Sequence, residues 1–187
     1  MHARASTYMD DLQNSFEEAF EAYSDELFRH ASIRLSDRER ALEITHEAFM
    51  KAWVYAQKGE EIKEIRPFLY RTLRNLIIDE YRKHKATSLE AMAERHNMDV
   101  EDFMTPDESN TIEAAIGRHE GKRVLEVLKD LPEPYKEAVV MRYIDGLSPT
   151  EIAAAIGESE NVVSVRVHRG LKKLRTMIEE QTHDGQS

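Results

Sequence analysis

The sequence contains no cysteine among its 187 residues. Disulfide bonds, thiolate zinc sites, iron–sulfur clusters and cysteine nucleophiles are therefore excluded. Only 7 glycines and 5 prolines are present, which is few turn formers for a protein of many strands. No apolar run approaches the roughly 20 residues that a membrane-spanning helix needs, and no signal-peptide core follows Met1. We expect a cytoplasmic protein with no membrane insertion.

Hydrophobic residues make up 41% of the chain and charged residues 33%. This composition is too apolar for general disorder, and with so few turn formers it favours an all-α fold. The net charge of −10 argues at first against a nucleic-acid partner.

The charge is distributed unevenly, however. Residues 66–85 contain 6 basic and 2 acidic side chains, whereas residues 86–120 contain 2 basic and 9 acidic ones. Residues 164–175 contain five basic side chains and no acidic one. Phosphate binding responds to the local potential within a Debye length of about 8–10 Å, so two basic patches in an acidic chain can face DNA. Either patch taken alone is more typical of a solvated helix face.

The first half of the chain carries three amphipathic helical patterns. Gly59 is expected to end the second helix, and Pro67 suits the first turn of the third. We expect the three helices to form one small domain over residues 10–85. Their apolar stripes are Phe16, Phe20, Tyr23 and Leu27; Leu42, Phe49, Trp53 and Ala56; and Leu69, Leu73, Leu76, Ile77 and Tyr81.

The middle of the chain differs in composition from both ends. Residues 86–119 are polar and acidic with little sustained periodicity, which predicts an acidic flexible linker. A helical pattern resumes at Val124, and Leu131-Pro132-Glu133-Pro134 breaks it before another helix expected over residues 138–143. We expect a second small helical domain over residues 120–180.

Two helices joined by a tight turn are predicted inside this second domain. Ser148-Pro149-Thr150-Glu151 has the pattern of a capping box with proline at the first helical position, and Gly157 should end the short helix that follows. Ser159 can cap a longer helix. Helix, glycine-containing turn and helix is the helix-turn-helix pattern. The stripe of the second helix is Val163, Val167, Leu171, Leu174 and Ile178.

The face of that helix opposite the stripe is polar and basic. A recognition helix contacts base edges in the major groove from its N-terminal turns, where asparagine pairs with adenine and arginine with guanine. The outward or flanking residues are Asn161, Ser164, Val165, His168, Arg169 and Lys172. Those placed to hold phosphates are Arg166, Lys172, Lys173 and Arg175. The alternative is an ordinary helical hairpin with a solvated basic face, in which Arg166 is a structural ion-pair partner.

With both halves in view, the sequence resembles the extracytoplasmic-function (ECF) sigma factors, the compact two-domain members of the sigma-70 family. Residues 41–53, ALEITHEAFMKAW, resemble the segment that binds core RNA polymerase, and residues 67–83, PFLYRTLRNLIIDEYRK, the segment at the −10 element. The segments that resemble the −35-binding domain are Leu131-Pro132, Gly146-Leu147-Ser148, Glu151-Ile152-Ala153 and residues 163–174, VSVRVHRGLKKL. Each motif is moderately specific, and both sets in this order are strongly specific.

The resemblance implies reversible binding to bacterial core RNA polymerase, recognition and local melting of promoter DNA, an anti-sigma partner, no cofactor and no covalent chemistry. It implies polymerase contacts at Glu43, His46, Glu47 and Phe49. It implies contacts to the −10 element at Lys51, Arg71, Arg74, Asn75 and Arg82. It implies contacts to the −35 element at Asn161, Ser164, Val165, His168 and Arg169, beside the phosphate-holding Arg166 and Lys172.

The sequence departs from the family pattern at several of these positions. Leu42 stands where an acidic residue is common, and His46 and Phe68 stand where glutamine and tryptophan are usual. Ser164 replaces the usual lysine or arginine. We therefore expect a differently tuned polymerase contact, and the −35 preference of relatives does not transfer.

Two other functions stay open. A stand-alone helix-turn-helix regulator would dimerise on palindromic DNA and gives no role to residues 43–49. A sigma-like decoy would bind an anti-sigma factor and never touch DNA, which the basic face of the last helix disfavours. No acid–base or nucleophile constellation points to an enzyme. Met50 stands where a His-Glu-x-x-His motif needs its second histidine, so no metal site is predicted.

Two residues have a structural alternative to a DNA contact. Trp53 lies on an apolar stripe, so packing in the core is favoured over stacking on a base. Asp79 precedes Arg82 by three residues and can pair with it on one helix face.

Overall fold

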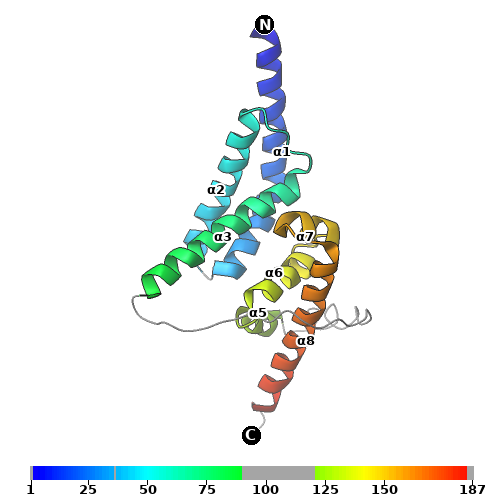
Figure 1. Ribbon diagram of the computed structural model, residues 1–187. Helices are drawn as coiled ribbons and strands as arrows, with labels where there is room; N and C mark the ends of the chain where they lie inside the picture. The colour runs from blue at the N-terminus through cyan, green and yellow to red at the C-terminus, as the bar shows by residue number, and fades with distance from the viewer. Residues whose placement is uncertain (1, 36, 90–120, 185–187) are drawn as a thin grey trace.

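The computed structural model describes residues 2–35, 37–89 and 121–184. Over these ranges the chain consists of helices and short connections with no strand, which confirms the all-α prediction (Figure 1). The predicted linker lies outside the described residues except for 86–89, which end α3. The elements are α1 (His2–Leu35), α2 (Arg38–Gln57), α3 (Ile65–Leu89), α5 (Gly121–Lys129), α6 (Glu133–Val139), the π-helix η1 (Val140–Ile144), α7 (Pro149–Ile156) and α8 (Glu160–Asp184).

Local signals set both ends of α2. Asp37 is its N-cap, and the Asp37 carboxylate accepts a hydrogen bond of 3.0 Å from the N–H of Arg40. At the other end, the N–H of Gly59 donates to the carbonyl of Ala56 at 3.0 Å. Gly59 has a φ of +84°, in the left-handed region that glycine adopts without steric cost. The prediction that Gly59 terminates this helix is confirmed.

The inward face of α2 is built largely from small residues. Ala41, Ala48 and Ala52 are all fully buried, which lets the backbones of neighbouring helices approach closely. Leu42 was expected in the buried stripe but is 47% exposed, so this part of the prediction was wrong. The physical reason is geometric: position 42 lies about 100° around the helix from Ala41, and the alanine face is the one that packs.

Side chains of the predicted stripes of this half pack against one another. The Trp53 ring meets the Phe16 ring edge-on, with centroids 5.2 Å apart, which confirms that Trp53 has a packing role. Leu69, Leu73 and Ile77 of α3 are fully buried, as their predicted stripe requires.

In the C-terminal half, α6 begins five residues earlier than the predicted helix start at Ala138. Pro134 lies in its first turn, where proline leaves no intrahelical donor unsatisfied, so the Leu131-Pro132-Glu133-Pro134 segment starts a helix directly after breaking the previous one. The helix then widens into η1, in which the N–H of Asp145 donates to the carbonyl of Val140 at 3.0 Å. A helix was therefore correctly predicted over residues 138–143, but its predicted start was too late in the sequence.

The helix-turn-helix signals appear in the structure as predicted. Ser148 and Glu151 form a reciprocal capping box at the start of α7. Gly157 ends α7 with a φ of +73°. Ser159 caps α8, because its hydroxyl accepts a hydrogen bond of 3.4 Å from the N–H of Val162. The second helix, α8, therefore projects from a fixed turn.

Replacing Ser148 with alanine is expected to destabilise the protein by about 1 kcal/mol at pH 7. Burial alone would raise the pKa of Glu151, but hydrogen bonds from Ser148 and the charge of Arg66 lower it below its usual 4.5. A lowered pKa contributes stability above the unfolded value that is lost as the pH falls through the folded value. Urea unfolding should therefore show the difference between variant and wild type shrinking below about pH 4.5. Thr176→Ala, at an exposed hydroxyl on α8, is the control, and an equal loss in both variants would contradict the capping role.

Gly170 allows α8 to approach α6 closely. A Cβ at this position would lie 2.7 Å from Cγ2 of Val139 and 3.2 Å from Cβ of Tyr135. Gly170→Ala is therefore expected to lower stability by roughly 1–3 kcal/mol through overpacking, although alanine is the better helix former. Thermal unfolding measures the effect, with the exposed Lys173→Ala as its partner. A higher melting temperature for Gly170→Ala would contradict this packing.

The two halves of the chain pack against each other. In Figure 1, α7 lies beside α3, and α1 also contacts α5 and η1. Leu147 and Ile152 of the C-terminal half are fully buried in the same apolar cluster as Leu27 and Tyr70 of the N-terminal half. The described structure is therefore a closed arrangement of both halves around a shared core.

Candidate functional site

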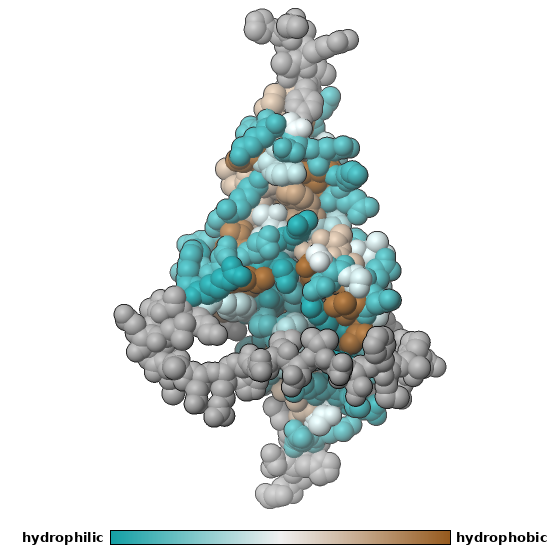
Figure 2. All heavy atoms as spheres, viewed as in Figure 1, coloured by the Kyte–Doolittle hydropathy of each residue, from teal (hydrophilic) through white to brown (hydrophobic). Residues whose placement is uncertain are grey.

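The outer side of α2 exposes an apolar stripe. Leu42, Met50 and Val54 are 47%, 60% and 43% exposed, and with His46 they recur every four residues on one helix face. Phe20 of α1 lies beside this stripe, 43% exposed, with its ring 6.5 Å from that of His46. We call these five residues the α2 surface. Figure 2 shows apolar residues reaching the molecular surface over the N-terminal helices.

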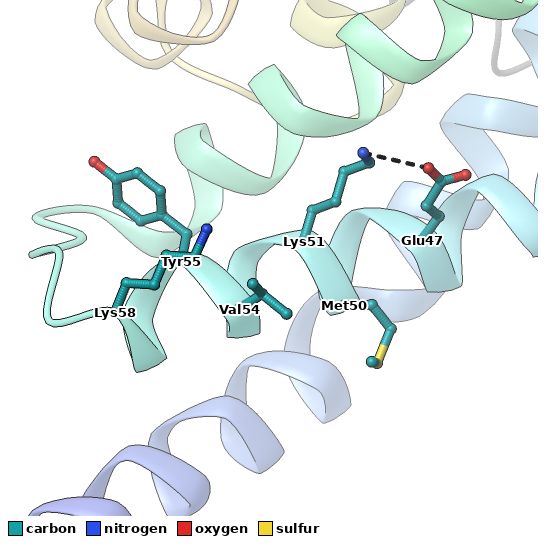
Figure 3. A pocket seen from close by; sticks show the side chains of 6 residues that line it. All are labelled: Glu47, Met50, Lys51, Val54, Tyr55 and Lys58. Carbon is teal, nitrogen blue, oxygen red and sulfur yellow. Dashed lines mark ion pairs between the residues drawn. The ribbon is translucent and has the colours of Figure 1, made fainter.

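Acidic side chains border the α2 surface. Arg40 donates to the carboxylate of Glu43 at 2.7 Å, and Glu47 pairs with Lys51 at 3.5 Å. Figure 3 shows Glu47 and Lys51 on one side of α2 and Met50 on the other. An apolar stripe with a charged rim is the anatomy of a protein–protein contact.

Of the predicted polymerase-binding residues, His46 lies within the α2 surface, and Glu43 and Glu47 lie on its acidic border. Phe49 differs, because it is only 7% exposed and its ring packs on that of Phe20 at 5.0 Å. In this arrangement Phe49 supports the α2 surface from beneath and does not face a partner.

The sequence-based prediction missed Leu42, Met50, Val54 and Phe20 as surface residues. Leu42 and Phe20 were assigned to core stripes, and both are more than two-fifths exposed. The four-residue spacing of Leu42, His46 and Met50 was visible in the sequence and was the available signal.

The predicted −10 residues are divided between two faces of α3 and the adjacent α2. Arg71, Asn75 and Arg82 are exposed and recur along one face of α3. Arg82 also pairs with Asp79 at 3.4 Å, which confirms the predicted internal pair. Lys51 is exposed on α2.

Arg74 is not free in the closed arrangement. Its Nε lies 2.9 Å from a carboxylate oxygen of Glu137 in α6, and its side chain is only 24% exposed. The expectation of an open DNA-facing arginine at position 74 therefore does not hold for this arrangement, because the C-terminal half occupies it.

The exposed face of α8 contains most of the predicted −35 residues. Val163 and Leu174 are buried, which fixes the rotation of the helix. Arg169 is partly buried. Arg166 pairs with Glu158 at 2.9 Å, which agrees with its structural alternative. The residues that are exposed on this face are Asn161, Ser164, Val165, His168 and Lys172.

Buried and partly buried polar contacts connect α1 and α3 with the C-terminal half. Nδ1 of His30 lies 2.7 Å from a carboxylate oxygen of Asp145, and both side chains are almost fully buried. Arg66 donates to Glu26 at 2.8 and 3.0 Å, to Glu151 at 3.2 Å and to the carbonyl of Asp145 at 2.7 Å. These contacts hold α1 and α3 against the turn that precedes α7.

Among the described residues, no group of three histidine, aspartate or glutamate side chains is placed to hold a metal ion. The helices of the described ranges also include none that is both long and apolar enough to cross a membrane.

Two known protein families match separate stretches of the chain. Residues 19–87 match the family described as Sigma-70 region 2, and residues 121–174 match the family described as Sigma-70, region 4. Together these matches cover more than half of the chain.

Similar proteins extend over nearly the whole length. The chain is 27% identical over 168 residues to the ECF RNA polymerase sigma factor SigW of Bacillus subtilis, covering 89% of this chain and 90% of that protein. It is 26% identical over 155 residues to ECF RNA polymerase sigma factor SigL of Mycobacterium tuberculosis, covering 82% and 83%.

Two solved structures share the fold. CnrH, solved with the cytosolic domain of CnrY, superposes with a TM-score of 0.66 at 21% identity, covering 94% of this chain and 95% of CnrH. The sigma factor RpoE of Bartonella quintana, solved with the anti-sigma factor NepR, gives a TM-score of 0.65 at 18% identity, covering 88% and 97%. With both sigma regions present in order, this chain belongs to the sigma-70 family and is one of its ECF sigma factors.

Proposed function

We propose that this chain binds core RNA polymerase through the α2 surface, recognises the −10 and −35 promoter elements with its two halves, and starts transcription of a specific set of genes. The observation that carries the proposal is the joint presence of two distinct surfaces in one sigma chain. One is the apolar α2 surface with its acidic rim, and the other is the polar, basic face of α8. Either surface alone would also fit a protein that does not select promoters.

The polymerase contact is assigned to the α2 surface on grounds of shape and charge. Exposed methionine and aromatic side chains are enriched at protein interfaces, and the acidic rim formed with Glu43 and Glu47 fits a basic partner. Leu42 stands where an acidic residue is common in the family, so this chain offers an apolar contact at that position.

The −10 contact is assigned to the exposed face of α3 with Lys51. Melting begins when a base leaves the stack and is held by the protein, at a cost of a few kcal/mol that binding must offset. Asn75 offers an amide for hydrogen bonds to a base edge, while Arg71 and Arg82 can hold the backbone beside it.

The −35 contact is assigned to the N-terminal turns of α8. The exposed face of this helix offers donors, acceptors and an apolar side chain, the combination that direct readout in the major groove uses. Asn161 and His168 are assigned to bases, and Lys172 to a phosphate.

An anti-sigma factor is proposed as a further partner. RpoE and CnrH were each solved bound to a second protein, named as an anti-sigma factor for RpoE. We assign to this chain a cytoplasmic location, where polymerase acts, and no catalytic step of its own.

The two alternative functions are weaker. A stand-alone regulator leaves the α2 surface without a role, and a decoy leaves the exposed face of α8 without one. The experiment that separates them is size-exclusion chromatography of the full chain with core polymerase and a fluorescent promoter fragment. We expect one complex containing all three, and promoter-specific binding only when polymerase is present. Specific binding of the chain alone as a dimer would support the regulator and contradict the proposal.

A further inference from the structure

Two arginines of the N-terminal half converge on one carboxylate of the C-terminal half. Nη1 of Arg34, in α1, lies 3.1 Å from Oε1 of Glu137, and Nε of Arg74, in α3, lies 2.9 Å from the same oxygen. Nη2 of Arg34 also lies 2.9 Å from the Glu133 carboxylate. The Arg34 and Glu137 side chains are 3% and 5% exposed. Both arginines therefore belong to the N-terminal half and both carboxylates to the C-terminal half, where Glu133 also pairs with Lys136 of α6 at 3.0 Å.

The arginine pair has the properties of an anion site that is already filled. Burial would lower the pKa of Arg34, but the carboxylates of Glu137 and Glu133 more than offset this, so the guanidinium stays charged. Its Nε is buried and finds no acceptor among the described residues. Guanidinium groups present several donors in a plane, a geometry that matches phosphate as well as carboxylate. If Glu137 leaves, the two cations need another anion.

This pair adjoins the face assigned to the −10 element. Arg74 directly precedes Asn75 on α3, and Arg71 lies one helical turn before it. A nucleic-acid strand held against the exposed face of α3 would pass within reach of both arginines once the C-terminal half has moved away. The backbone phosphates of that strand are the anions that would take the place of the Glu137 carboxylate beside Arg34 and Arg74.

In the closed arrangement, the α3 face and the α8 face lie too close together to contact both promoter elements at once. Arg74 touches Glu137 in α6, and two residues further Val139 packs against Gly170 of α8. With 1.5 Å of helix per residue, the exposed base-facing residues of α8 lie within roughly 40 Å of Arg74. Elements centred near positions −35 and −10 are about 25 base pairs apart, or about 85 Å along B-DNA at 3.4 Å per pair. The halves must separate to engage both elements, which exposes Arg34 and Arg74.

We propose that Arg34 and Arg74 together bind a backbone phosphate of the promoter strand in the open protein, and that Glu137 occupies this phosphate site in the closed protein. This inference rests on the proposed function, since it places the phosphate beside the −10 face. It adds Arg34, a residue of α1, to the DNA-binding groups. It also gives the chain an internal competitor for DNA that needs no second protein. The pairs His30–Asp145 and Arg66–Glu151 would hold the same closure.

The first test measures closure in the free, full-length chain. Since the sequence has no cysteine, Glu64→Cys and Ala154→Cys can be labelled for energy transfer without further changes. Both positions are exposed, and they flank the Arg66–Glu151 contact between the halves. In this background Glu137→Gln is expected to lower the transfer efficiency, and Glu126→Gln, an exposed acid on α5, is expected to leave it unchanged. Equal efficiencies in the Glu137→Gln and unsubstituted proteins would overturn the closing role.

The second test measures the phosphate site with a twelve-nucleotide single strand of thymidylate as the probe. Glu137→Gln should bind the strand at least about fivefold more tightly than the wild type, because a charged competitor is gone. Adding Arg34→Gln or Arg74→Gln to Glu137→Gln should weaken binding and reduce the slope of log K against log salt by about 0.7, the value for one lost single-strand phosphate contact. Adding Arg29→Gln, at an exposed arginine on α1, is the matched control and should leave the slope unchanged.

Unchanged affinity in Glu137→Gln, or an unchanged slope in both arginine variants, would overturn the proposal. Circular dichroism checks that each variant is folded, and Arg74→Gln, at the more exposed position, keeps the test valid if Arg34→Gln unfolds. These measurements use no polymerase. A chain that binds the strand as predicted but directs no transcription would contradict the proposed function alone, and a functional sigma factor with an unchanged slope would contradict this inference alone.

Discussion

Replacing Leu42 and Met50 together with aspartate is expected to reduce the affinity for core RNA polymerase by roughly a thousandfold, because interface hot spots cost about 2 kcal/mol or more each when lost. The loss of affinity should exceed that caused by replacing the same two residues with alanine. In addition to removing apolar contact area, each aspartate would bring an unpaired charge into a surface that loses its water on binding. The introduced aspartates would also lie near the carboxylates of Glu43 and Glu47, which would repel them. Co-purification with core polymerase and competition against another sigma factor both measure this loss.

A matched control comes from the other half of the chain. Leu125 is 41% exposed, close to the 47% of Leu42, but it lies on α5 in the C-terminal half and not on α2. Leu125→Asp should leave the capture of polymerase unchanged. Because Leu42 and Met50 are exposed, the double variant should keep the helical content and unfolding midpoint of the wild type within a small margin. Undiminished capture of polymerase by the folded double variant would contradict the assignment of the α2 surface.

Replacing Asn161 and His168 together with alanine is expected to remove recognition of the −35 element. Each good base contact contributes about 1–3 kcal/mol of discrimination, so two lost contacts reduce specific promoter affinity by about a hundredfold or more. Both side chains are exposed on α8, so the substitutions should not disturb the packing of the buried Val163 and Leu174 on the other side of the helix. Binding of the holoenzyme to promoter fragments with intact and with scrambled −35 sequences measures the difference.

Lys172→Ala is the comparison for this pair, since Lys172 is exposed on α8 and is assigned to a phosphate. It should weaken binding to both fragments equally and reduce the salt slope by about 0.9, the value for one phosphate contact on a duplex. In Asn161→Ala with His168→Ala, by contrast, the preference for the intact fragment should disappear. If the double variant still distinguishes intact from scrambled −35 sequences as well as the wild type does, α8 does not read bases through these residues.

The parts of the fold that the sequence predicted are those decided by local chemistry. The capping box of Ser148 and Glu151 and the left-handed glycines at 59 and 157 depend on residues close together in the chain, and each terminates or starts a helix where expected. Such signals are strong because few residues satisfy an unpaired backbone group or adopt a positive φ.

The rotation of α2 was harder to predict. A stripe chosen by the size of its apolar residues selects Leu42, whereas the structure buries Ala41, Ala48 and Ala52. Alanine contributes little apolar area, but a face of alanines allows neighbouring helices to approach closely. Hydrophobic periodicity alone does not distinguish a large residue directed at a partner from one directed at the core.

The pairing of the two halves could not be obtained from the sequence. Glu137 is separated by 63 residues from Arg74 and by 103 from Arg34, and nothing in local spacing indicates that they meet. Only the tertiary arrangement shows that Arg74, expected on DNA, is held by a carboxylate of the same chain. For the same reason Arg34 was absent from the predicted site.

Run-off transcription on fragments of the source genome, using purified core polymerase with and without this chain, tests the sigma function most directly. We expect new transcripts that begin at defined positions only when the chain is present, downstream of shared sequences near −10 and −35. These transcripts should disappear with the double replacement of Leu42 and Met50 by aspartate. Identical start positions with and without the chain would contradict the assignment of this protein as a promoter-specificity factor.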